Sequence, residues 1–412
     1  MAGVVIVGAG QAGVQAAESL RRGGYAGAVT LIGEEPVAPY QRPPLSKAYL
    51  AGTMDLDRVI LKPETTLAED AIAFVPATRI TGLDRTARTV TAEDGRSWSY
   101  EHLILATGSR VRRLQVAGAE LAGVHYLRTT ADVDGLRAEL LAGQRLAVIG
   151  GGYIGLEVAA VARKAGLDVT VIEAAERVLA RVTTPEISAF YESLHRAEGV
   201  TVLTGTGVTA LEAGADLARV GAVRLADGSA VPADLVLVGI GIIPNAELAA
   251  QAGLATTNGI DTDANARTSD PAIFAIGDCA SRPLAHYGDR RGRLESVHNA
   301  LEQAKLAAAA ILGAAPPPLE APWFWSDQYD VKLQIAGLST GAARTVLRGD
   351  PASRRFAAFH LDGANRLLAV DAVNSAPEFI VGRQLIARQQ AVAPEKLADM
   401  SISMKAIAAD PA

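Results

Sequence analysis

The sequence predicts an α/β protein in which one βαβ unit occurs twice, followed by a smaller C-terminal α+β block. An apolar strand pattern leads into the glycine turn Gly8-Ala-Gly-Gln-Ala-Gly13, and a second one leads into Gly150-Gly-Gly-Tyr-Ile-Gly155. Each turn is followed by a helical pattern, a second apolar run and an acidic residue, Glu34 or Glu173. Strand, glycines, helix, strand and carboxylate in this order indicate a Rossmann-like dinucleotide-binding domain. Two such domains are therefore expected.

Composition agrees with a multidomain globular protein. The 412 residues exceed what one hydrophobic core usually serves, so two or three domains are expected. A net charge of −6 argues against nucleic-acid binding, which needs a basic face. The first residues enter a strand at once and no apolar run reaches the length of a membrane span, so neither a signal peptide nor a membrane segment is expected. The single cysteine, Cys279, excludes an intramolecular disulfide, and we expect a cytoplasmic protein.

The first unit begins at Val4. Its helix is expected from about Ala12 to Arg22, because two glycines then stop it. Residues 36–66 lack clear periodicity and contain a proline-rich loop that leads into a short helix. The strands expected next are Phe74–Ile80, Thr89–Ala92, Trp98–Tyr100 and the apolar run 102–108.

The second unit begins at Arg145, after a crossover over residues 114–127. Its helix is expected over Tyr153–Ala165, closed by Gly166. A triple proline at 316–318 marks a domain boundary. The later elements expected are a buried strand at 269–278, a helix at 296–315, and a third block at 320–412 with alternating strand patterns and a last helix near 394–398.

The glycine turns carry a specific chemistry. The first glycine permits the tight bend, the second lets backbone amides approach a pyrophosphate, and the third lets helix and strands pack closely. The carboxylate after the second strand accepts hydrogen bonds from ribose hydroxyls. Glu173 repels a 2′-phosphate and so favours NADH over NADPH, although Arg177 and Arg181 lie near enough to leave NADPH open.

The two units differ two residues after the last glycine, where one has Gln15 and the other Glu157. Glu157 lies in an otherwise apolar helix, so its carboxylate needs a partner or a raised pKa, unless it merely complements the helix dipole. Arg42 and Lys47, in the proline-rich loop, are candidates to reach a phosphate, a flavin ring or Glu157. From the residues alone, two solvated loop charges are an equal alternative.

Polar residues follow the apolar strand at 269–278 and precede the next helix. Asp278 lies at the carboxyl edge of the sheet, where open α/β folds bind ligands. The helix start at 296–299 presents free N–H groups and a positive dipole end that would stabilise a reduced flavin pyrimidine. We interpret His298 as a core or capping histidine and Cys279 as a small buried apolar residue. No metal site is predicted.

Two further clusters have open interpretations. Trp323-Phe-Trp325 is either a core anchor of the third block or a surface over a flavin or a partner. Arg290, Arg291 and Arg293 form a basic run in an acidic protein. Such a run is usually a solvated loop, but it also suits an acidic electron-acceptor protein.

Taken together, these stretches resemble the NADH-dependent ferredoxin reductases that serve bacterial oxygenases, which have a glutathione-reductase-like flavoprotein architecture. The resemblance covers essentially the whole chain. Its most specific stretches are the loop Arg-Pro-Pro-Leu-Ser-Lys and the run Trp-Phe-Trp-Ser-Asp-Gln. The stretches that carry it lie at 7–13, 39–47, 105–110, 149–157, 275–280, 295–300 and 322–329.

The resemblance implies that the first unit binds FAD and the second NADH. Glu34 would hold the adenosine ribose, Asp278 the ribityl chain, and the backbone of Val297 the flavin pyrimidine. Lys47 and Glu157 would pair as the catalytic residues beside flavin N5, where hydride arrives. The implied FAD residues are Gly8, Gly10, Gln11, Ala12, Gly13, Glu34, Arg42, Lys47, Ile80, Ala106, Thr107, Gly108, Arg128, Gly277, Asp278 and Val297. The implied NADH residues are Gly150, Gly152, Tyr153, Ile154, Gly155, Glu157, Glu173, Arg181, Ile240 and Gly241.

The implied domains are a split FAD domain at 1–113 and 241–319, an NADH domain at 114–240 and a C-terminal α+β domain at 320–412. The implied partner is a small acidic [2Fe–2S] ferredoxin, docking near the basic run and Trp325 and supplying a cytochrome P450 or a ring dioxygenase. Residues 36–67 contain no cysteine, which excludes dithiol–disulfide chemistry. The alternatives are a rubredoxin reductase, an NADH oxidase or quinone reductase of the same fold, and a non-enzymatic redox-responsive binding protein.

Overall fold

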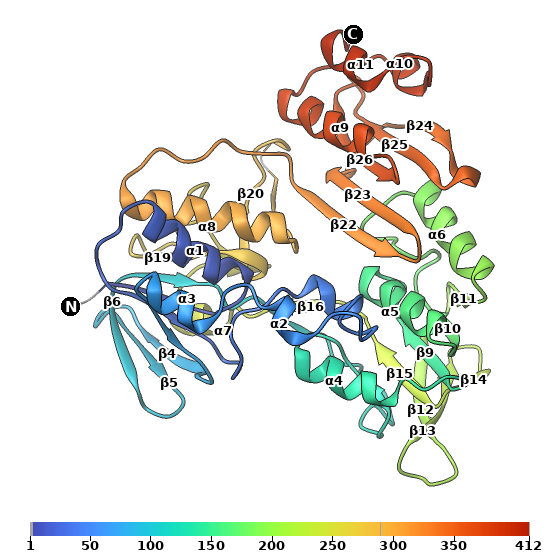
Figure 1. The fold of residues 1–412 in the computed structure, drawn as a ribbon, viewed down its shortest axis with the longest axis horizontal. Helices are drawn as coiled ribbons and strands as arrows, with labels where there is room; N and C mark the ends of the chain where they lie inside the picture. Colours follow the sequence, from blue (N-terminus) through green and yellow to red (C-terminus); the bar gives the residue numbers. More distant parts are fainter. Residues whose placement is uncertain (1–2, 289, 412) are drawn as a thin grey trace. The chain divides into compact units, whose positions relative to one another are not determined.

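In a computed structural model that describes residues 3–288 and 290–411, the chain divides into two compact units (Figure 1). Each unit is assembled from three separate stretches of sequence, and the chain passes between the units five times. Unit 1 contains Met1–Gln41, Leu56–Arg110 and Ile243–Pro322, and unit 2 contains Arg42–Asp55, Val111–Ile242 and Trp323–Ala412.

Unit 1 is built on a seven-stranded sheet. Its parallel part has the order β3-β2-β1-β6, with β19 on the far side of β6, which is the strand order of a Rossmann fold. β6 also pairs antiparallel with β5, which pairs with β4. The strands are β1 (Gly3–Val7), β2 (Val29–Ile32), β3 (Ile72–Val75), β4 (Ile80–Asp84), β5 (Thr89–Ala92), β6 (Ser97–Leu105) and β19 (Ile273–Ala275).

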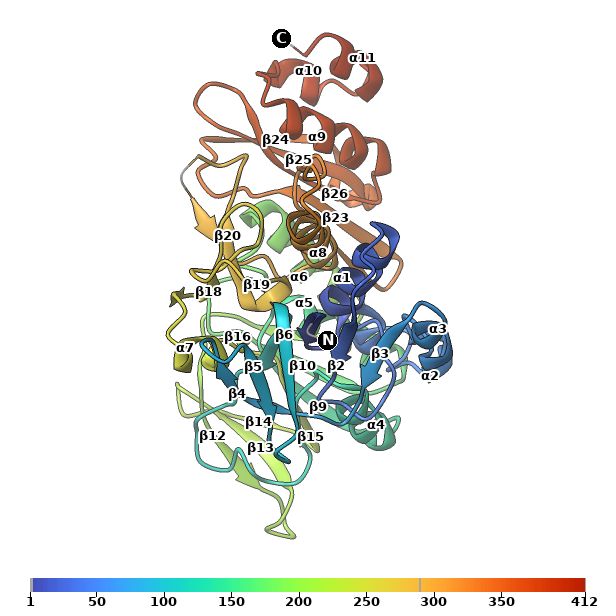
Figure 2. The ribbon, with the colours of Figure 1, turned by 90° about the vertical axis from the view of Figure 1, so that its left-hand side faces the viewer.

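Helices α1 (Gln11–Arg22) and α8 (Val297–Leu312) lie side by side on one face of this sheet (Figure 2). Apolar residues of both helices and of the strands, such as Leu20, Leu31 and Phe274, form the core there. A second apolar cluster covers the opposite face. The remaining elements of unit 1 are α2 (Leu56–Val59), α3 (Glu64–Glu69), α7 (Glu247–Gln251), β17 (Thr256–Thr257), β18 (Gly259–Asp261), η2 (Gly277–Cys279), β20 (Ala280–Pro283) and β21 (Arg291–Gly292).

Unit 2 repeats this architecture with a five-stranded parallel sheet of order β11-β10-β9-β15-β8. A three-stranded antiparallel sheet packs on it through an apolar cluster. The elements are η1 (Pro43–Ser46), β8 (Val124–His125), α4 (Thr130–Glu139), β9 (Arg145–Ile149), α5 (Tyr153–Lys164), β10 (Asp168–Ile172), α6 (Pro185–Ala197), β11 (Thr201–Leu203), β12 (Val208–Ala213), β13 (Val220–Leu225), β14 (Ala230–Pro232) and β15 (Leu235–Val238). Two short strands, β7 (Ser109–Val111) and β16 (Ile242–Pro244), lie where the chain passes between units.

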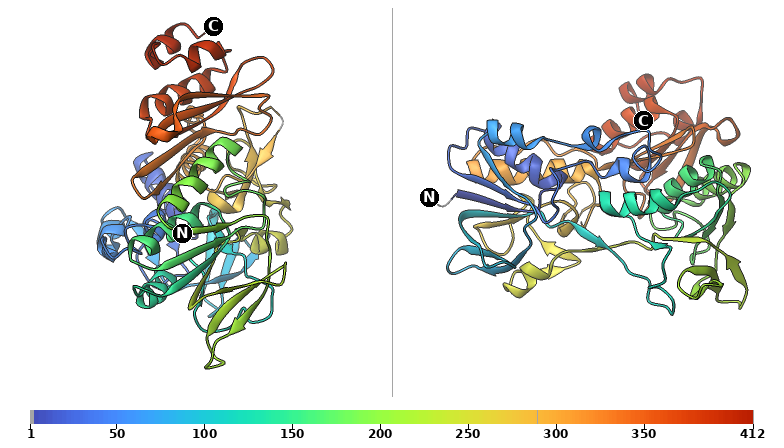
Figure 3. Two further views of the ribbon diagram at one scale, coloured as in Figure 1. Left: turned by 90° about the vertical axis from the view of Figure 1, so that its right-hand side faces the viewer. Right: turned by 60° about the horizontal axis from the view of Figure 1, so that its bottom comes forward.

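The C-terminal part of unit 2, drawn in orange and red in Figure 3, contains an antiparallel sheet, whose strand order is β22-β23-β26-β25-β24. Helix α9 packs on β23 and β26, closely enough that a Cβ at Gly382 would overlap with Val370. The elements are β22 (Trp323–Gln328), β23 (Val331–Gly337), β24 (Arg344–Asp350), η3 (Pro351–Ser353), β25 (Arg355–Leu361), β26 (Leu367–Val373), α9 (Ala376–Arg388), α10 (Pro394–Ala398) and α11 (Met404–Ala409).

The predicted fold class is confirmed, with three local corrections. The predicted strand Phe74–Ile80 is wrong, because β3 ends at Val75 and β4 begins at Ile80. The pieces expected at 98–100 and 102–108 are one strand, β6. The last helix is α11 rather than α10, and α9 was not predicted. The predicted domain limits remain predictions, and the contacts place residues 42–55 in unit 2.

None of the helices in the part of the chain that the structure describes is both long and apolar enough to cross a membrane.

Candidate functional site

The first glycine turn joins β1 to α1 and has a different requirement at each glycine. Gly8 has φ +113°, and a Cβ there would overlap with the carbonyl of Ala106. A Cβ at Gly13 would overlap with the carbonyl of Gly8, so the fold itself needs both glycines. At Gly10 no heavy atom lies within 4 Å of such a Cβ, and no side chain caps α1. The turn therefore leaves open space in front of a helix N-terminus, which fits a pyrophosphate.

The second turn, between β9 and α5, repeats this arrangement. Gly150 has φ +107°, and a Cβ there would overlap with the carbonyl of Gly239. A Cβ at Gly155 would overlap with the carbonyl of Gly150, whereas Gly152 again faces open space. Helix α5 also begins without a side-chain cap. Each unit thus carries a cradle that fits a dinucleotide pyrophosphate.

The two predicted ribose-binding carboxylates do not occupy equivalent positions. Glu173 directly follows β10, and its backbone N–H donates to the carbonyl of Leu203. In unit 1 the equivalent bond is made by Gly33, whose backbone N–H donates to the carbonyl of Val75. Glu34 comes one residue later and is exposed, with Arg79 3.7 Å away. The Glu173 carboxylate instead accepts hydrogen bonds from the backbone N–H groups of Gly151, at 2.7 Å, and Ala175, at 2.8 Å.

Further residues predicted for FAD lie in unit 1, some of them after the carboxyl ends of its strands and others at the starts of its helices. Asp278 accepts a hydrogen bond from Ser109 at 3.0 Å, and the Gly277 N–H donates to Gln303 at 2.6 Å. Val297 is the first residue of α8, whose N-cap Ser296 accepts from the Asn299 N–H. Of the others, Gln11 and Ala12 begin α1, Ile80 begins β4, Ala106 and Thr107 follow β6, and Gly108 has φ +64°.

Three residues predicted for FAD belong to unit 2. Lys47 directly follows η1, and Arg42 directly precedes η1 and donates a hydrogen bond to the carbonyl of Arg128. The structure therefore assembles these three side chains with the second cradle's unit rather than with the first.

The centre of the unit 2 site is an ion pair between Lys47 and Glu157. Lys47 Nζ lies 2.6 Å from Glu157 Oε2, and the Glu157 side chain is 1% exposed. Glu157 comes two residues after the last glycine of the second turn, in the first turns of α5, where its neighbours are buried and apolar. A buried carboxylate in such a helix requires a partner, and Lys47 provides the opposite charge.

Two serines complete the coordination of this carboxylate, and neither was predicted. Ser46 donates to Oε2, and Ser326 donates to Oε1 at 2.6 Å. Both serines lie inside the two most specific stretches of the sequence. Alternation along β22 was the signal that could have selected Ser326, because it places Ser326 and Gln328 on the buried face.

The remaining residues predicted for NADH surround the second turn. Tyr153 packs against Phe324 with ring centroids 4.6 Å apart, and burial of its hydroxyl raises its pKa well above the usual value. Ile154 and Arg181 are exposed, and Ile240 and Gly241 follow β15. Arg177 donates to Ser188 and to the carbonyl of Ala180, so its guanidinium is already engaged within unit 2.

The basic run is not simply a solvated loop. Arg293 is 9% exposed and pairs with Glu295 at 2.6 Å, while Arg291 donates to the carbonyls of Thr262 and Ser281. Arg290 and Arg291 are exposed, and the Arg291 side chain is 43% exposed. Docking of an acidic electron-acceptor protein on this run stays a prediction.

The other singled-out residues are placed as follows. Cys279 is fully buried, and burial raises the pKa of its thiol. His298 is buried and lies 3.2 Å from Glu320. Trp323 and Trp325 pack together with centroids 5.6 Å apart, and Trp323 also contacts Phe379 of α9. Both tryptophans are half-buried. Each therefore packs in part, as a core anchor does, and is in part exposed, as a surface residue is.

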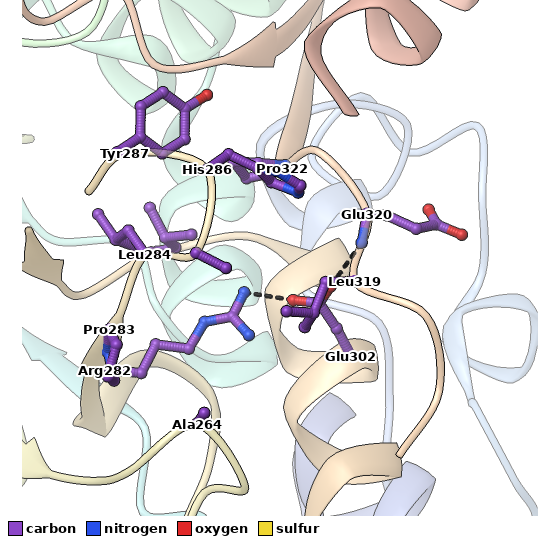
Figure 4. A pocket seen from close by; sticks show the side chains of 12 residues that line it. Ala264, Arg282, Pro283, Leu284, His286, Tyr287, Glu302, Leu319, Glu320 and Pro322 are labelled. Carbon is purple, nitrogen blue, oxygen red and sulfur yellow. Dashed lines mark hydrogen bonds and ion pairs between the residues drawn. The ribbon is translucent and has the colours of Figure 1, made fainter. Parts of the chain in front are cut away.

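Unit 1 also contains a small pocket of about 50 Å³ away from the glycine turn's residues (Figure 4). Its polar lining is internally paired, because Arg282 forms a buried ion pair with Glu302, and Glu302 accepts the N–H of Glu320. Leu284, Leu319 and Pro322 supply apolar walls. The pocket is too small for a dinucleotide.

Comparison with known proteins gives consistent matches along the chain. The family model described as pyridine nucleotide-disulphide oxidoreductase matches residues 2–304, and the model described as reductase C-terminal matches residues 323–408. Putidaredoxin reductase of Pseudomonas putida is 47% identical over 409 residues, which covers 98% of this chain and 96% of that protein. The ferredoxin–NAD(+) reductase component of the p-cumate 2,3-dioxygenase system of Pseudomonas putida is 40% identical over 403 residues, covering 98% and 97%.

A solved structure extends the likeness to three dimensions. The crystal structure of the covalent putidaredoxin reductase–putidaredoxin complex contains a chain with a TM-score of 0.96 and 47% identity to this one. The match covers 100% of this chain and 99% of that chain.

Proposed function

The chain belongs to the pyridine nucleotide-disulphide oxidoreductase family, and on that premise we propose that it is an NADH-dependent ferredoxin reductase. Its acceptor is a small [2Fe–2S] ferredoxin that supplies a cytochrome P450 or an aromatic-ring dioxygenase. The full-length likeness to putidaredoxin reductase and to a dioxygenase-system ferredoxin–NAD(+) reductase supports this acceptor class. The proposed compartment is the cytoplasm, where NADH is formed and a lone cysteine stays reduced.

The observation that carries the proposal is the buried Lys47–Glu157 pair beside the second of two pyrophosphate cradles. Family members bind FAD and NAD(H), and the two cradles fit two dinucleotides. We assign FAD to the turn at Gly8–Gly13 and NADH to the turn at Gly150–Gly155. When bound, FAD accepts two electrons with a hydride from NADH and releases them singly to an iron–sulfur protein.

The residues of the chain contribute position and charge. The helix N-termini behind the two turns hold the pyrophosphates, and Glu173, already oriented by Gly151 and Ala175, disfavours a 2′-phosphate. Glu157 fixes the Lys47 ammonium, a hydrogen-bond donor and positive charge at the proposed hydride-transfer position. Cys279 is buried and alone, so electrons leave for another protein rather than for a dithiol.

Stopped-flow reduction tests the donor. We expect NADH to reduce the purified flavoprotein at least about tenfold faster than NADPH at equal concentration, the ratio that about 1.4 kcal/mol gives. Cytochrome c reduction, with and without an added [2Fe–2S] ferredoxin, tests the acceptor. Turnover that is equally fast without ferredoxin would instead indicate an oxidase or quinone reductase, and preference for added rubredoxin would indicate a rubredoxin reductase.

A further inference from the structure

A chain of hydrogen bonds in unit 2 ends on the Glu157 carboxylate. Ser326 Oγ donates to Glu157 Oε1 at 2.6 Å, and Gln328 Nε2 donates to Ser326 Oγ at 3.2 Å. Gln328 Oε1 lies 2.8 Å from His195 Nε2, and His195 Nδ1 lies 3.3 Å from the Tyr329 hydroxyl. The chain therefore connects α5, β22 and α6 from the ion pair to a half-buried tyrosine.

From Glu157 to His195 this chain of hydrogen bonds is closed to water. Ser326 and His195 are fully buried, Gln328 is 1% exposed and Glu157 is 2% exposed. A donor lost from this chain cannot be replaced by solvent without opening the packing between α5 and β22. Each member therefore constrains the next.

The direction in which each hydrogen bond of this chain is donated follows from the chemistry of the side chains. A serine hydroxyl has one hydrogen, so Ser326, which accepts from the Gln328 amide, donates that hydrogen to Glu157. The Gln328 carbonyl oxygen then faces His195, which must present an Nε2–H donor and accept at Nδ1 from Tyr329. Every donor in the chain points toward Glu157.

The opposite tautomer of His195 would reverse this order. A bare Nε2 would face an amide N–H of a flipped Gln328, whose oxygen would then draw the Ser326 hydrogen away from Glu157. Glu157 would lose one of its two serine donors while remaining buried. Burial lowers the pKa of His195, although its hydrogen bond with Gln328 raises it. The lowered pKa favours the neutral ring, and the tautomer of that ring decides in which direction the donors of this chain point.

We propose that His195, Gln328 and Ser326 are positioning residues that keep the Glu157 carboxylate aimed at Lys47. The inference rests on the proposed function, because the hydride-transfer step is what the Lys47 ammonium serves. It adds three residues, one on α6 and two on β22, to those that position the groups of that step.

The test compares four variants of the flavin-loaded full chain. Ser326→Ala removes the donor and Ser326→Thr keeps it. Gln328→Glu replaces the amide by an isosteric acceptor that competes for the Ser326 hydrogen. Thr183→Val is the matched control, since Thr183 donates to Asp371 elsewhere in unit 2 and loses a buried hydroxyl of the same kind.

Two measurements distinguish a positioning role from a nonspecific structural effect of the substitution. The first is the limiting rate of flavin reduction by NADH without ferredoxin, together with the apparent Kd for NADH from the dependence of that rate on NADH concentration. The second is the infrared carboxylate signal of Glu157 in protein labelled with ¹³C-glutamate, assigned with Glu157→Gln.

We expect Ser326→Ala and Gln328→Glu to slow reduction about tenfold with an apparent Kd for NADH within about twofold of wild type, as for a lost charge-assisted hydrogen bond. The carboxylate bands of Glu157 should shift in both variants. Ser326→Thr should recover the rate and the bands lost in Ser326→Ala, and Thr183→Val should match wild type. Unchanged reduction rates and unchanged Glu157 carboxylate bands in Ser326→Ala would overturn the positioning role. Neither readout uses an acceptor protein, so loss of ferredoxin dependence would refute the proposed function alone.

Discussion

At the scale of single residues, the two glycine turns separate what folding requires from what a ligand requires. A Cβ at Gly155 would overlap with a backbone carbonyl, which cannot move away without disturbing β9 and α5. A Cβ at Gly152 would meet no atom within 4 Å. The same contrast holds for Gly13 and Gly10 in unit 1. The second glycine of each turn is therefore explained only by a molecule that approaches it.

This contrast predicts opposite outcomes for two alanine substitutions. We expect Gly155→Ala to lower the free energy of unfolding by about 3 kcal/mol, since it overpacks a backbone contact. Gly152→Ala should leave unfolding within about 0.5 kcal/mol of wild type but weaken NADH binding at least tenfold, because the new methyl group fills the pyrophosphate approach. Urea unfolding and an NADH titration measure the two effects. Equal stability of the two variants would contradict the packing argument.

Removing Lys47 and removing Glu157 should lower the free energy of unfolding by different amounts. Lys47→Met leaves an almost fully buried carboxylate without its counter-charge, and we expect it to cost about 3–5 kcal/mol of unfolding free energy. Glu157→Gln should cost less, because the Lys47 side chain is 19% exposed and its ammonium can turn to water. Denaturant unfolding of both single variants and the double variant gives the coupling. A greater loss in Glu157→Gln than in Lys47→Met would contradict this assignment.

At the scale of elements, a buried histidine near the end of helix α6 makes the stability of the folded chain depend on pH. Burial lowers the pKa of His195, near the end of α6, although Gln328 opposes this by hydrogen bonding. Below the usual histidine pKa of about 6.5 the unfolded chain binds a proton that the folded chain does not, so stability falls as pH falls. His102 and His125 also have pKa values lowered by burial and contribute in the same direction.

We therefore expect His195→Gln to flatten the loss of stability below about pH 6.5, by at most about 1.4 kcal/mol per pH unit. Unfolding in urea at pH 7.5, 6.5 and 5.5 measures the slope against wild type. The comparison of slopes is independent of any constant loss caused by the substitution itself. An unchanged slope would show that His195 titrates normally in the folded chain.

The last two helices depend on one arginine in β24. Arg348 is 4% exposed, pairs with Glu378 of α9 at 3.1 Å, and donates to the carbonyls of Leu397, Asp399 and Ile402 around α10 and α11. We expect Arg348→Met to lose about 3–5 kcal/mol of unfolding free energy, with faster amide exchange over residues 394–409. Arg354→Met, which removes a partly exposed ion pair with Asp330, is the control and should cost less than about 1 kcal/mol. Unchanged amide exchange in Arg348→Met would refute this role.

Sequence patterns predicted the elements around the glycine turns well, because a glycine turn, an apolar strand and a helix stop are local signals. They failed between 74 and 80, where a single predicted strand covers the end of β3, the loop after it and the start of β4. The need of Glu157 for a partner was also predictable. Its serine partners were not, because they lie 111 and 169 residues away in sequence and no periodicity reports such a meeting.

At the scale of the whole molecule, a chain with two dinucleotide cradles has a single cysteine, and that cysteine is buried. Cys279 Sγ donates to the carbonyls of Leu105 and Ile276, and burial raises the pKa of the thiol. We expect iodoacetamide to leave the native enzyme active, and Cys279→Ala to keep most of its ferredoxin-dependent activity at a cost of about 1–2 kcal/mol in stability. Loss of that activity in a folded, flavin-loaded Cys279→Ala protein would contradict a direct flavin-to-protein route.

The short stretch at 42–55, which folds with residues far downstream, limits how this protein can be recombined. A fragment cut at 114–240, the limits predicted for the NADH domain, would keep Glu157 but lose Lys47, Ser46 and Ser326, so its carboxylate would be left without these partners. A chimera that exchanges this domain between relatives must therefore transplant three stretches of sequence together. The Lys47–Glu157 pair and its serine donors are kept only when all three stretches come from the same protein.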